Sequence, residues 1–229
     1  MITAAPSPLA AIAVFGALTE VERAALTLHS RILRVPADHP VMKKGEPAES
    51  MMVLLEGRLR VGTVSLEGRA FTFRIVEPVQ LLGEIGVLDG GPRSADVTSM
   101  MPSRLLVLRR RDCLDAIERH PAVARAMILL LCGRLRDTSL GLEQIATQRL
   151  PARMAALLLR LAADYGRPTA GGGVQLPMRL SQGEIGTLVA ATREAVNKQL
   201  MQFRDEGVLA LVAGRIEISR PEALAALLE

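Results

Sequence analysis

The stretch Leu82-Gly-Glu-Ile-Gly-Val-Leu-Asp-Gly-Gly-Pro-Arg-Ser-Ala-Asp-Val97 gathers glycines, a proline and charged residues inside a region of short apolar runs. Glycine lets a backbone come close to a ligand, and Gly90-Gly91-Pro92 predicts a tight turn. Arg93 and Ser94 then place a planar cation beside a hydroxyl, which suits a phosphate group. Glu84 would repel a phosphate, but its carboxylate can bind a sugar hydroxyl of the same ligand. This stretch, called the cassette below, therefore predicts a nucleotide site.

The composition is that of a globular protein with room for two modest domains. Of the 229 residues, 49% are apolar, the formal net charge is +4 and the mean hydropathy is +0.27. No run of eighteen uncharged apolar residues occurs, and the N-terminus lacks the basic region of a secretory signal. We expect a cytoplasmic protein without a membrane span.

The cysteines and histidines favour structural roles over metal binding. Cys113 and Cys132 fit neither a disulfide framework nor a zinc pattern, so both are expected to pack in the interior. The three histidines form no spaced cluster and are expected in core or cap positions: His29, His39 and His120.

The spacing of apolar residues changes where the β-rich part of the chain begins. A capping box, Thr19 with Glu22, precedes apolar residues at helical spacing, so the chain opens with helices. Short apolar runs separated by turns then predict a jelly roll or barrel. The expected strands are residues 31–35, 51–55, 58–61 and 104–108, with turns at 44–47, 56–57 and 67–68.

Two helices are expected after the strands. Asp112 is predicted to cap a short helix that ends at Arg119, and His120-Pro121 is typical of the start of another. If this second helix reaches Thr147, its 27 residues span roughly 40 Å.

The long helix carries an apolar seam with alternating steps of four and three, as in a coiled coil. The seam residues are Ala124, Ile128, Leu131, Leu135, Thr138, Leu142 and Ile145. They predict a homodimer formed through residues 121–148, although an ordinary core helix is the alternative, and a second stripe could cover the β-domain: Val123, Met127 and Leu130. The hydroxyls of Thr138 and Ser139 stand where leucine would suit a purely structural seam, so they can serve a ligand.

The last third of the chain reads as a winged helix-turn-helix. After a boundary near residue 148, a helix from 152 to about 165 and a flexible loop at 167–173 are expected. Ser181 with Glu184 caps a short helix to Val189, and Thr192 caps a second helix that ends at Gly207. A hairpin over residues 208–219 and a last helix capped by Ser219-x-x-Glu222 complete the pattern.

In a helix-turn-helix the N-terminal turns of the second helix meet base edges in the major groove. Arg193 can bind guanine and Glu194 can accept from cytosine, so the pair suits a G·C step. The full set of expected DNA contacts adds the two helix starts to this face: Ser181, Gln182, Thr192, Arg193, Glu194, Asn197 and Lys198. The alternative is a structural corner of two helices with solvated charges.

These motifs resemble the cyclic AMP receptor protein family, a branch of the group that includes the fumarate and nitrate reduction regulators (CRP/FNR). The resemblance covers nearly the whole chain. Gly83-Glu84-Ile85 and Arg93-Ser94-Ala95 match that family's phosphate-binding cassette, in which the glutamate holds the ribose 2′-hydroxyl and the arginine and serine hold the cyclic phosphate. The resemblance further implies that Thr138 and Ser139 contact the purine, the serine from the other subunit, and that Arg134 pairs with Glu84.

Several positions depart from the family pattern. The loop between Glu84 and Arg93 is one residue shorter than in the best-known enteric member. Lys198 replaces a recognition-helix arginine and cannot make the same planar fork. Ala190 stands at the usual turn glycine, where a left-handed alanine costs about 1–2 kcal/mol. No cysteine precedes Cys113, so the N-terminal iron-sulfur cluster of the oxygen-sensing branch is not available.

The resemblance implies an α+β fold with three parts: a β jelly-roll (double-stranded β-helix) sensor at 1–120, a dimerisation helix at 121–148 and a winged helix-turn-helix at 149–229. It implies a regulator, not an enzyme, that binds double-stranded DNA, a second copy of itself and RNA polymerase under control of cyclic AMP. The alternatives are cyclic GMP, a cyclic dinucleotide, haem or no effector. A cupin-type enzyme would need clustered metal ligands, and a nucleotide-binding module of a kinase or channel would leave the helix-turn-helix without a purpose.

Overall fold

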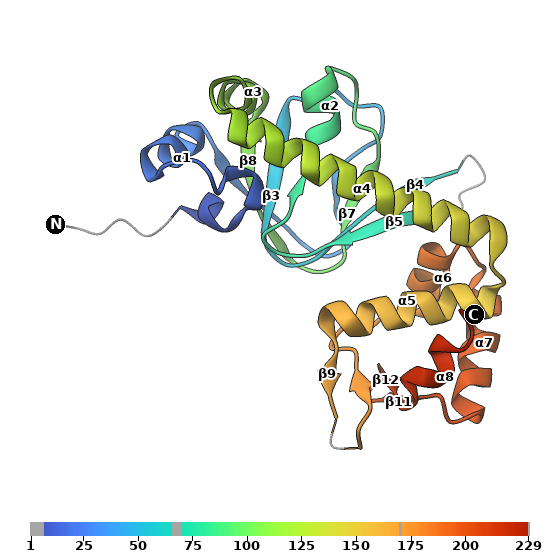
Figure 1. The fold of residues 1–229 in the computed structure, drawn as a ribbon. Helices are drawn as coiled ribbons and strands as arrows, with labels where there is room; N and C mark the ends of the chain where they lie inside the picture. The colour runs from blue at the N-terminus through green and yellow to red at the C-terminus, as the bar shows by residue number, and fades with distance from the viewer. Residues whose placement is uncertain (1–6, 66–69, 170, 229) are drawn as a thin grey trace. The chain divides into compact units, whose positions relative to one another are not determined.

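The computed structural model describes residues 7–65, 70–169 and 171–228, which divide into two compact units. The first unit ends at Asp137 and the second begins at Thr138, so helix α4 (Pro121–Thr147) contributes to both (Figure 1). The domain limits at residues 120 and 148 stay predictions.

The first unit opens with short helices, as the sequence predicts: η1 (Pro8–Ala11), η2 (Ala13–Phe15) and α1 (Glu20–Thr27). The backbone N–H of Glu22 donates to Thr19 Oγ1 at 3.3 Å, and that of Thr19 donates to Glu22 Oε2 at 2.7 Å, which confirms the capping box.

In the described part of this unit, eight strands form two antiparallel sheets, in the orders β1-β8-β3-β6 and β2-β7-β4-β5. The strands are β1 (Arg31–Val35), β2 (Pro40–Met42), β3 (Ser50–Glu56), β4 (Leu59–Val64), β5 (Ala70–Val76), β6 (Leu81–Leu82), β7 (Asp96–Ser99) and β8 (Ser103–Arg109). The four expected runs are all strands, whereas β2, β5, β6 and β7 were not predicted. The turns at 44–47 and 56–57 contain Gly45 and Gly57 with positive φ, and the turn expected at 67–68 lies outside the described residues.

The two sheets share one apolar core. Leu54 and Leu105 of the first sheet and Leu59 and Val76 of the second belong to a single buried cluster. The opposite face of the first sheet packs against the N-terminal helices and against Val123 of α4. This alternation is what half-buried strands in a sandwich require.

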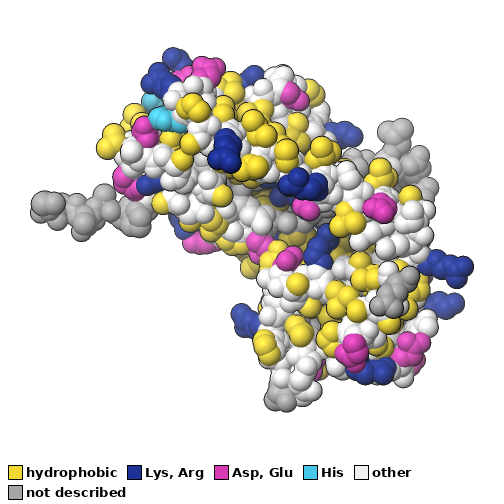
Figure 2. Space-filling view, viewed as in Figure 1, with side chains coloured by type: hydrophobic (Ala, Val, Ile, Leu, Met, Phe, Trp, Pro, Cys, Tyr) yellow, Lys and Arg dark blue, Asp and Glu magenta, His cyan; other side chains and the backbone are white. Residues whose placement is uncertain are grey.

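Three helices complete the unit: α2 (Glu84–Asp89), α3 (Arg110–Arg119) and the first part of α4. The prediction that Asp112 caps α3 is wrong, because the helix begins two residues earlier and Arg109 holds the N-cap position. The carboxylate of Asp112 instead lies 3.5 Å from His29 Nδ1. Figure 2 shows histidine and acidic side chains side by side over α1 and α3.

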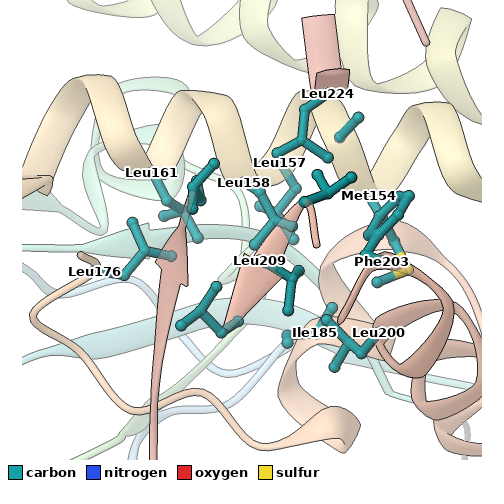
Figure 3. Packing of buried hydrophobic residues seen from close by; sticks show 14 of the residues in the cluster. Met154, Leu157, Leu158, Leu161, Leu176, Ile185, Leu200, Phe203, Leu209 and Leu224 are labelled. Atoms are coloured by element: carbon teal, nitrogen blue, oxygen red, sulfur yellow. The ribbon is translucent and has the colours of Figure 1, made fainter. Parts of the chain in front are cut away.

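The second unit contains a helix-turn-helix and a four-stranded sheet of order β11-β12-β10-β9. Its elements are α5 (Leu150–Tyr165), β9 (Arg167–Pro168), β10 (Val174–Gln175), α6 (Gln182–Val189), α7 (Arg193–Asp205), β11 (Leu209–Val212), β12 (Arg215–Ile218) and α8 (Pro221–Ala225). Figure 3 shows its core, in which Leu158 and Leu161 of α5 face the buried sides of the other elements.

Three local predictions for this unit are corrected. Residues 167–173 do not form only a loop, because β9 and β10 pair here and extend the wing. Helix α5 begins at Leu150 rather than residue 152. The cap expected at Ser219 is absent, since Arg220 holds the N-cap position of α8 without a side-chain bond.

Candidate functional site

The cassette folds as a short strand, a glycine turn and helix α2. Gly83 has φ +78° and Gly90 has φ +77°, a left-handed conformation in which a Cβ is strained. A Cβ on Gly83 would lie 2.6 Å from Arg93 Nη1, and one on Gly86 would lie 2.6 Å from the Cβ of Ala48. These two glycines therefore make room for the cassette's own arginine and for its packing, rather than only for a ligand.

Arg93 is held in a fixed orientation by the backbone. It is 7% exposed, and its Nη1 donates to the carbonyl oxygens of Ser50 at 2.8 Å and Gly83 at 3.0 Å. Its Nη2 donates to Ser50 Oγ at 3.1 Å. Burial lowers the pKa of Arg93, and the charges of Glu46 and Glu84 oppose that shift. Among the described residues no bond uses Nε, so one edge of the guanidinium can still bind an anion in a bidentate manner.

Glu84 is the buried acid of the cassette and is 2% exposed. Its Oε1 pairs with Nη1 of Arg134 on α4, and Nη2 of Arg134 donates to the carbonyl oxygen of Leu81. The structure thus brings Glu84 and Arg134 together. The ion pair joins the cassette to α4 within the first unit, so a group that binds Glu84 acts directly on that helix.

The other predicted ligand residues are more exposed. Ser94 lies at the surface beside the buried Arg93, Ile85 is exposed, and Ala95 is half-buried. Thr138 and Ser139 are exposed residues of α4 in the second unit, and their contact with a ligand stays a prediction.

Arg74 of β5 was missed by the sequence reasoning. Burial lowers its pKa to about 10, the like charge of Arg134 adds to this shift, and the carboxylates of Glu84 and Asp137 oppose it. An arginine at an inward-facing position of a strand with alternating apolar residues could have indicated Arg74, but β5 itself was not predicted.

The apolar seam of α4 is exposed at alternating positions in the single chain. Ile128, Leu135 and Leu142 are 59%, 68% and 68% exposed. Val123 and Met127, on the second stripe, are buried. The two stripes therefore have different environments, and the seam is an apolar surface without a covering element among the described residues of this chain.

The helix-turn-helix positions its polar face as predicted. Thr192 Oγ1 accepts from the backbone N–H of Ala195 at 3.2 Å, and the capping box of Ser181 with Glu184 is present. Val196, Leu200 and Phe203 turn the opposite side of α7 into the core. The predicted DNA contacts of α7 are Arg193, Glu194, Asn197 and Lys198, and the helix keeps them on the side away from that core.

Two details connect the helices of this motif. Gln182 Nε2 donates to Asn197 Oδ1 at 2.9 Å, which links the start of α6 to the polar face of α7. Ala190 adopts the left-handed conformation with φ 51° and ψ 52°, so the turn keeps its geometry and tolerates the strain.

The described residues contain no group of three or more His, Cys, Asp or Glu side chains that could hold a metal. Cys113 is buried as expected, whereas Cys132 is only partly buried. In the same residues no helix is long and apolar enough to cross a membrane.

Comparison with known proteins assigns both units. A cyclic nucleotide-binding domain model matches residues 32–120, and a Crp-like helix-turn-helix domain model matches residues 152–227. A CRP-like cAMP-activated global transcriptional regulator of Mycobacterium tuberculosis (strain CDC 1551 / Oshkosh) is 31% identical over 217 residues, which cover 95% of this chain and 96% of that protein. The cyclic AMP receptor protein of Thermus thermophilus is 30% identical over 194 residues, covering 85% and 84%.

Solved structures agree with this result. A CRP/FNR family transcriptional regulator from Thermus thermophilus is 26% identical with a TM-score of 0.71, covering 86% of this chain and 98% of that one. FixK2 from Bradyrhizobium japonicum, at 21% identity and a TM-score of 0.76, shares the fold over 86% and 96% of the two chains. With a nucleotide-binding β-domain, a long helix and a Crp-like helix-turn-helix in one chain, this protein belongs to the CRP/FNR family of DNA-binding transcription regulators.

Proposed function

We propose that this regulator binds a purine 3′,5′-cyclic nucleotide in the cassette and that the nucleotide controls its affinity for palindromic DNA. The observation that carries the proposal is the buried Arg93, whose guanidinium is held by Ser50 and Gly83 and keeps one edge available for a phosphate. Ser94 and Glu84 belong to the same cassette and offer a donor for the phosphate and an acceptor for the ribose. Likeness to the relatives named for cyclic AMP supports cyclic AMP as the first ligand to test.

A homodimer follows from the exposed seam of α4. Ile128, Leu135 and Leu142 are each more than half exposed and recur at the spacing of a two-stranded coiled coil. A second copy of the helix would cover them. In such a dimer the two α7 helices would read half-sites about 34 Å apart, which is one turn of DNA.

The ion pair between Glu84 and Arg134 supports a route from ligand to dimer helix. A ligand changes a conformational equilibrium only if it binds one state better than another. A ribose hydroxyl that hydrogen-bonds to Glu84 competes with or reinforces its contact to Arg134, and so favours one position of α4. We propose that Thr138 and Ser139 then contact the base, and that the change in α4 reorients both DNA-reading helices.

A role on DNA implies residence in the cytoplasm, and we propose RNA polymerase as the further partner of the DNA-bound dimer.

Calorimetric titration of the full chain with cyclic AMP and cyclic GMP tests the proposal. At least one should bind, and Arg93→Ala should abolish that binding. Because Arg93 also bonds to the backbone, far-UV circular dichroism must show that the variant is folded, and the milder Ser94→Ala should weaken binding without unfolding. Arg60→Ala on the same domain is the matched charge control and should bind as the wild type does. Absence of binding by both nucleotides, or unchanged affinity in Arg93→Ala, refutes the proposal.

A further inference from the structure

Arg74 places a cation on the interior face of the second sheet. In the β4–β5 pair, Arg74 is opposite Val61 and Val76 is opposite Leu59. Residues that are directly opposite, and residues two apart on one strand, project to the same side of a sheet. Val61, Val76 and Leu59 all belong to the buried core between the sheets. The half-buried Arg74 therefore points to the core side, where an apolar residue would be expected.

The charges around Arg74 locate it relative to the cassette. The charge of Glu84 raises the pKa values of both Arg74 and Arg93. The pKa of Arg74 is also shifted by the charges of Arg134 and Asp137, and that of Arg93 by the charge of Glu46. Arg74 is therefore on the interior face of the sheet and close enough to Glu84 and to its partner Arg134 for their charges to act on it. With Arg93 on the phosphate and Glu84 on the ribose, the base is the part of the nucleotide that remains for Arg74 to bind.

Arg74 also has unused hydrogen-bonding capacity. Among the residues that the structure describes, its guanidinium makes no hydrogen bond or ion pair, whereas Arg134 already pairs with Glu84 and Leu81. Glu84 and Asp137 act on this guanidinium only through their charges, and a partly buried guanidinium without hydrogen-bond acceptors is stabilised by any ligand that brings them. Arginine offers donors only, five of them in a planar fork.

The two common purines differ at the edge that such a fork would meet. Guanine presents the acceptors O6 and N7, whereas adenine presents N7 beside the N6 amino group, which is a donor. A guanidinium therefore matches guanine and opposes adenine. Glutamine has the reverse preference, because its amide can accept from N6 and donate to N7 of adenine.

We propose that Arg74 recognises the base of the bound nucleotide through guanine O6 and N7, and so makes this site prefer guanine cyclic nucleotides. This inference rests on the proposed function and concerns its ligand class. Likeness to relatives points to cyclic AMP, whereas the donor-only side chain at this position of this chain points to guanine.

Calorimetric titration of wild type, Arg74→Gln and Arg60→Gln with cyclic GMP and cyclic AMP tests the inference. Arg60 is opposite Ile75 on the outer side of the same strand pair, so its variant removes the same charge without touching the interior. Wild type should bind cyclic GMP more tightly than cyclic AMP. Arg74→Gln should lower the ratio of the two affinities by about tenfold or more, which corresponds to one bidentate contact, and Arg60→Gln should leave the ratio unchanged.

Four outcomes are decisive. An unchanged ratio in Arg74→Gln, or an equal loss for both nucleotides, overturns base recognition while the proposed function stands. Failure of wild type to bind any cyclic nucleotide overturns the proposed function itself. A titration with cyclic di-GMP distinguishes the source of the guanine. If Arg74→Gln weakens the binding of cyclic di-GMP and also lowers the affinity ratio of the two mononucleotides, Arg74 recognises guanine in the dinucleotide as well. Loss of the dinucleotide alone means that Arg74 binds a second phosphate, and it overturns the inference.

Discussion

The Glu84 carboxylate of α2 and the Arg134 guanidinium of α4 form an ion pair at the point where the cassette meets the long helix. The Glu84 side chain is 3% exposed, whereas the Arg134 side chain is 20% exposed. The acid is therefore desolvated and depends on its partner, while the arginine keeps access to water. Loss of Arg134 would therefore leave a buried carboxylate without its partner, whereas loss of Glu84 leaves an arginine that water can reach, so the first loss should cost more.

Removal of this carboxylate should destabilise the first unit. Glu84→Gln leaves Arg134 and Arg74 without their buried anion, and we expect the free energy of unfolding to fall by about 1–3 kcal/mol, less than for a fully buried pair. Urea unfolding measures the change. Glu84→Gln combined with Arg134→Met should cost less than the sum of the single variants, and strict additivity would show that the pair is not coupled.

The polar face of α7 should determine DNA sequence preference. Arg193→Ala is expected to weaken binding to a specific site by about 1–3 kcal/mol, the value of one bidentate base contact, and to leave nucleotide affinity unchanged. Fluorescence anisotropy with specific and random duplexes measures the two DNA affinities. Arg204→Ala, at the other end of α7, is the matched control and should keep the specificity ratio. Equal loss on both duplexes in Arg193→Ala would mean that Arg193 contacts only phosphate.

The seam of α4 should hold two copies together. Leu135→Asp places a charge at a position that is 68% exposed in the single chain and that a partner helix would bury. Sedimentation equilibrium should show a shift from dimer to monomer. Leu140→Asp alters another exposed leucine of α4, 53% exposed, on the side of the helix away from the seam, and it should remain dimeric. A dimeric Leu135→Asp protein would rule out this seam as the interface.

The left-handed Ala190 should be a site of relievable strain. Ala190→Gly removes a Cβ at φ 51° and is expected to raise stability by up to about 1 kcal/mol, or about 2–4 °C in Tm. Ala156→Gly in the interior of α5 is the opposite control, and it should lower stability by about 1 kcal/mol. A destabilised Ala190→Gly would show that flexibility gained in the unfolded chain exceeds the relieved strain.

The buried thiol of Cys113 should produce alkaline sensitivity. Burial raises the pKa of Cys113 from 9.0 to about 12, and the charge of Asp112 adds to this. Between these values the unfolded thiol loses its proton while the folded one keeps it. The contribution of Cys113 to the free energy of unfolding is therefore fully present below pH 9 and falls as the pH rises. Between about pH 9.5 and 11, the free energy of unfolding of the wild type should fall by about 1 kcal/mol more per pH unit than that of Cys113→Ala. Identical slopes in wild type and Cys113→Ala contradict the prediction.

Patterns within a few residues were enough to predict most helices of this chain. The capping boxes at Thr19 and Ser181, the cap at Thr192 and the full length of α4 depend on hydrogen bonds and spacings between neighbours in sequence. Local rules also had limits. Asp112 and Ser219 are good caps by residue type, but the adjoining helices have Arg109 and Arg220 at the N-cap position. Residue type alone therefore does not fix the first turn of a helix.

The cassette was recognised from residue types, yet its geometry required the folded chain. Residue chemistry indicated that Arg93 suits a phosphate, but only the β3 backbone at Ser50 and the turn at Gly83 orient the guanidinium. Likewise the sequence could not reveal that Gly83 and Gly86 make room for Arg93 and Ala48.

By itself the sequence determined the family, the order of the parts and the chemical types in the nucleotide site and the DNA-reading helix. Only the tertiary structure decided that Glu84 pairs with Arg134 and that Arg74 shares the interior face with Val61. The reason is physical: helix caps and seams arise from contacts a few residues apart, whereas the field at a buried charge is set by strands and helices distant in sequence.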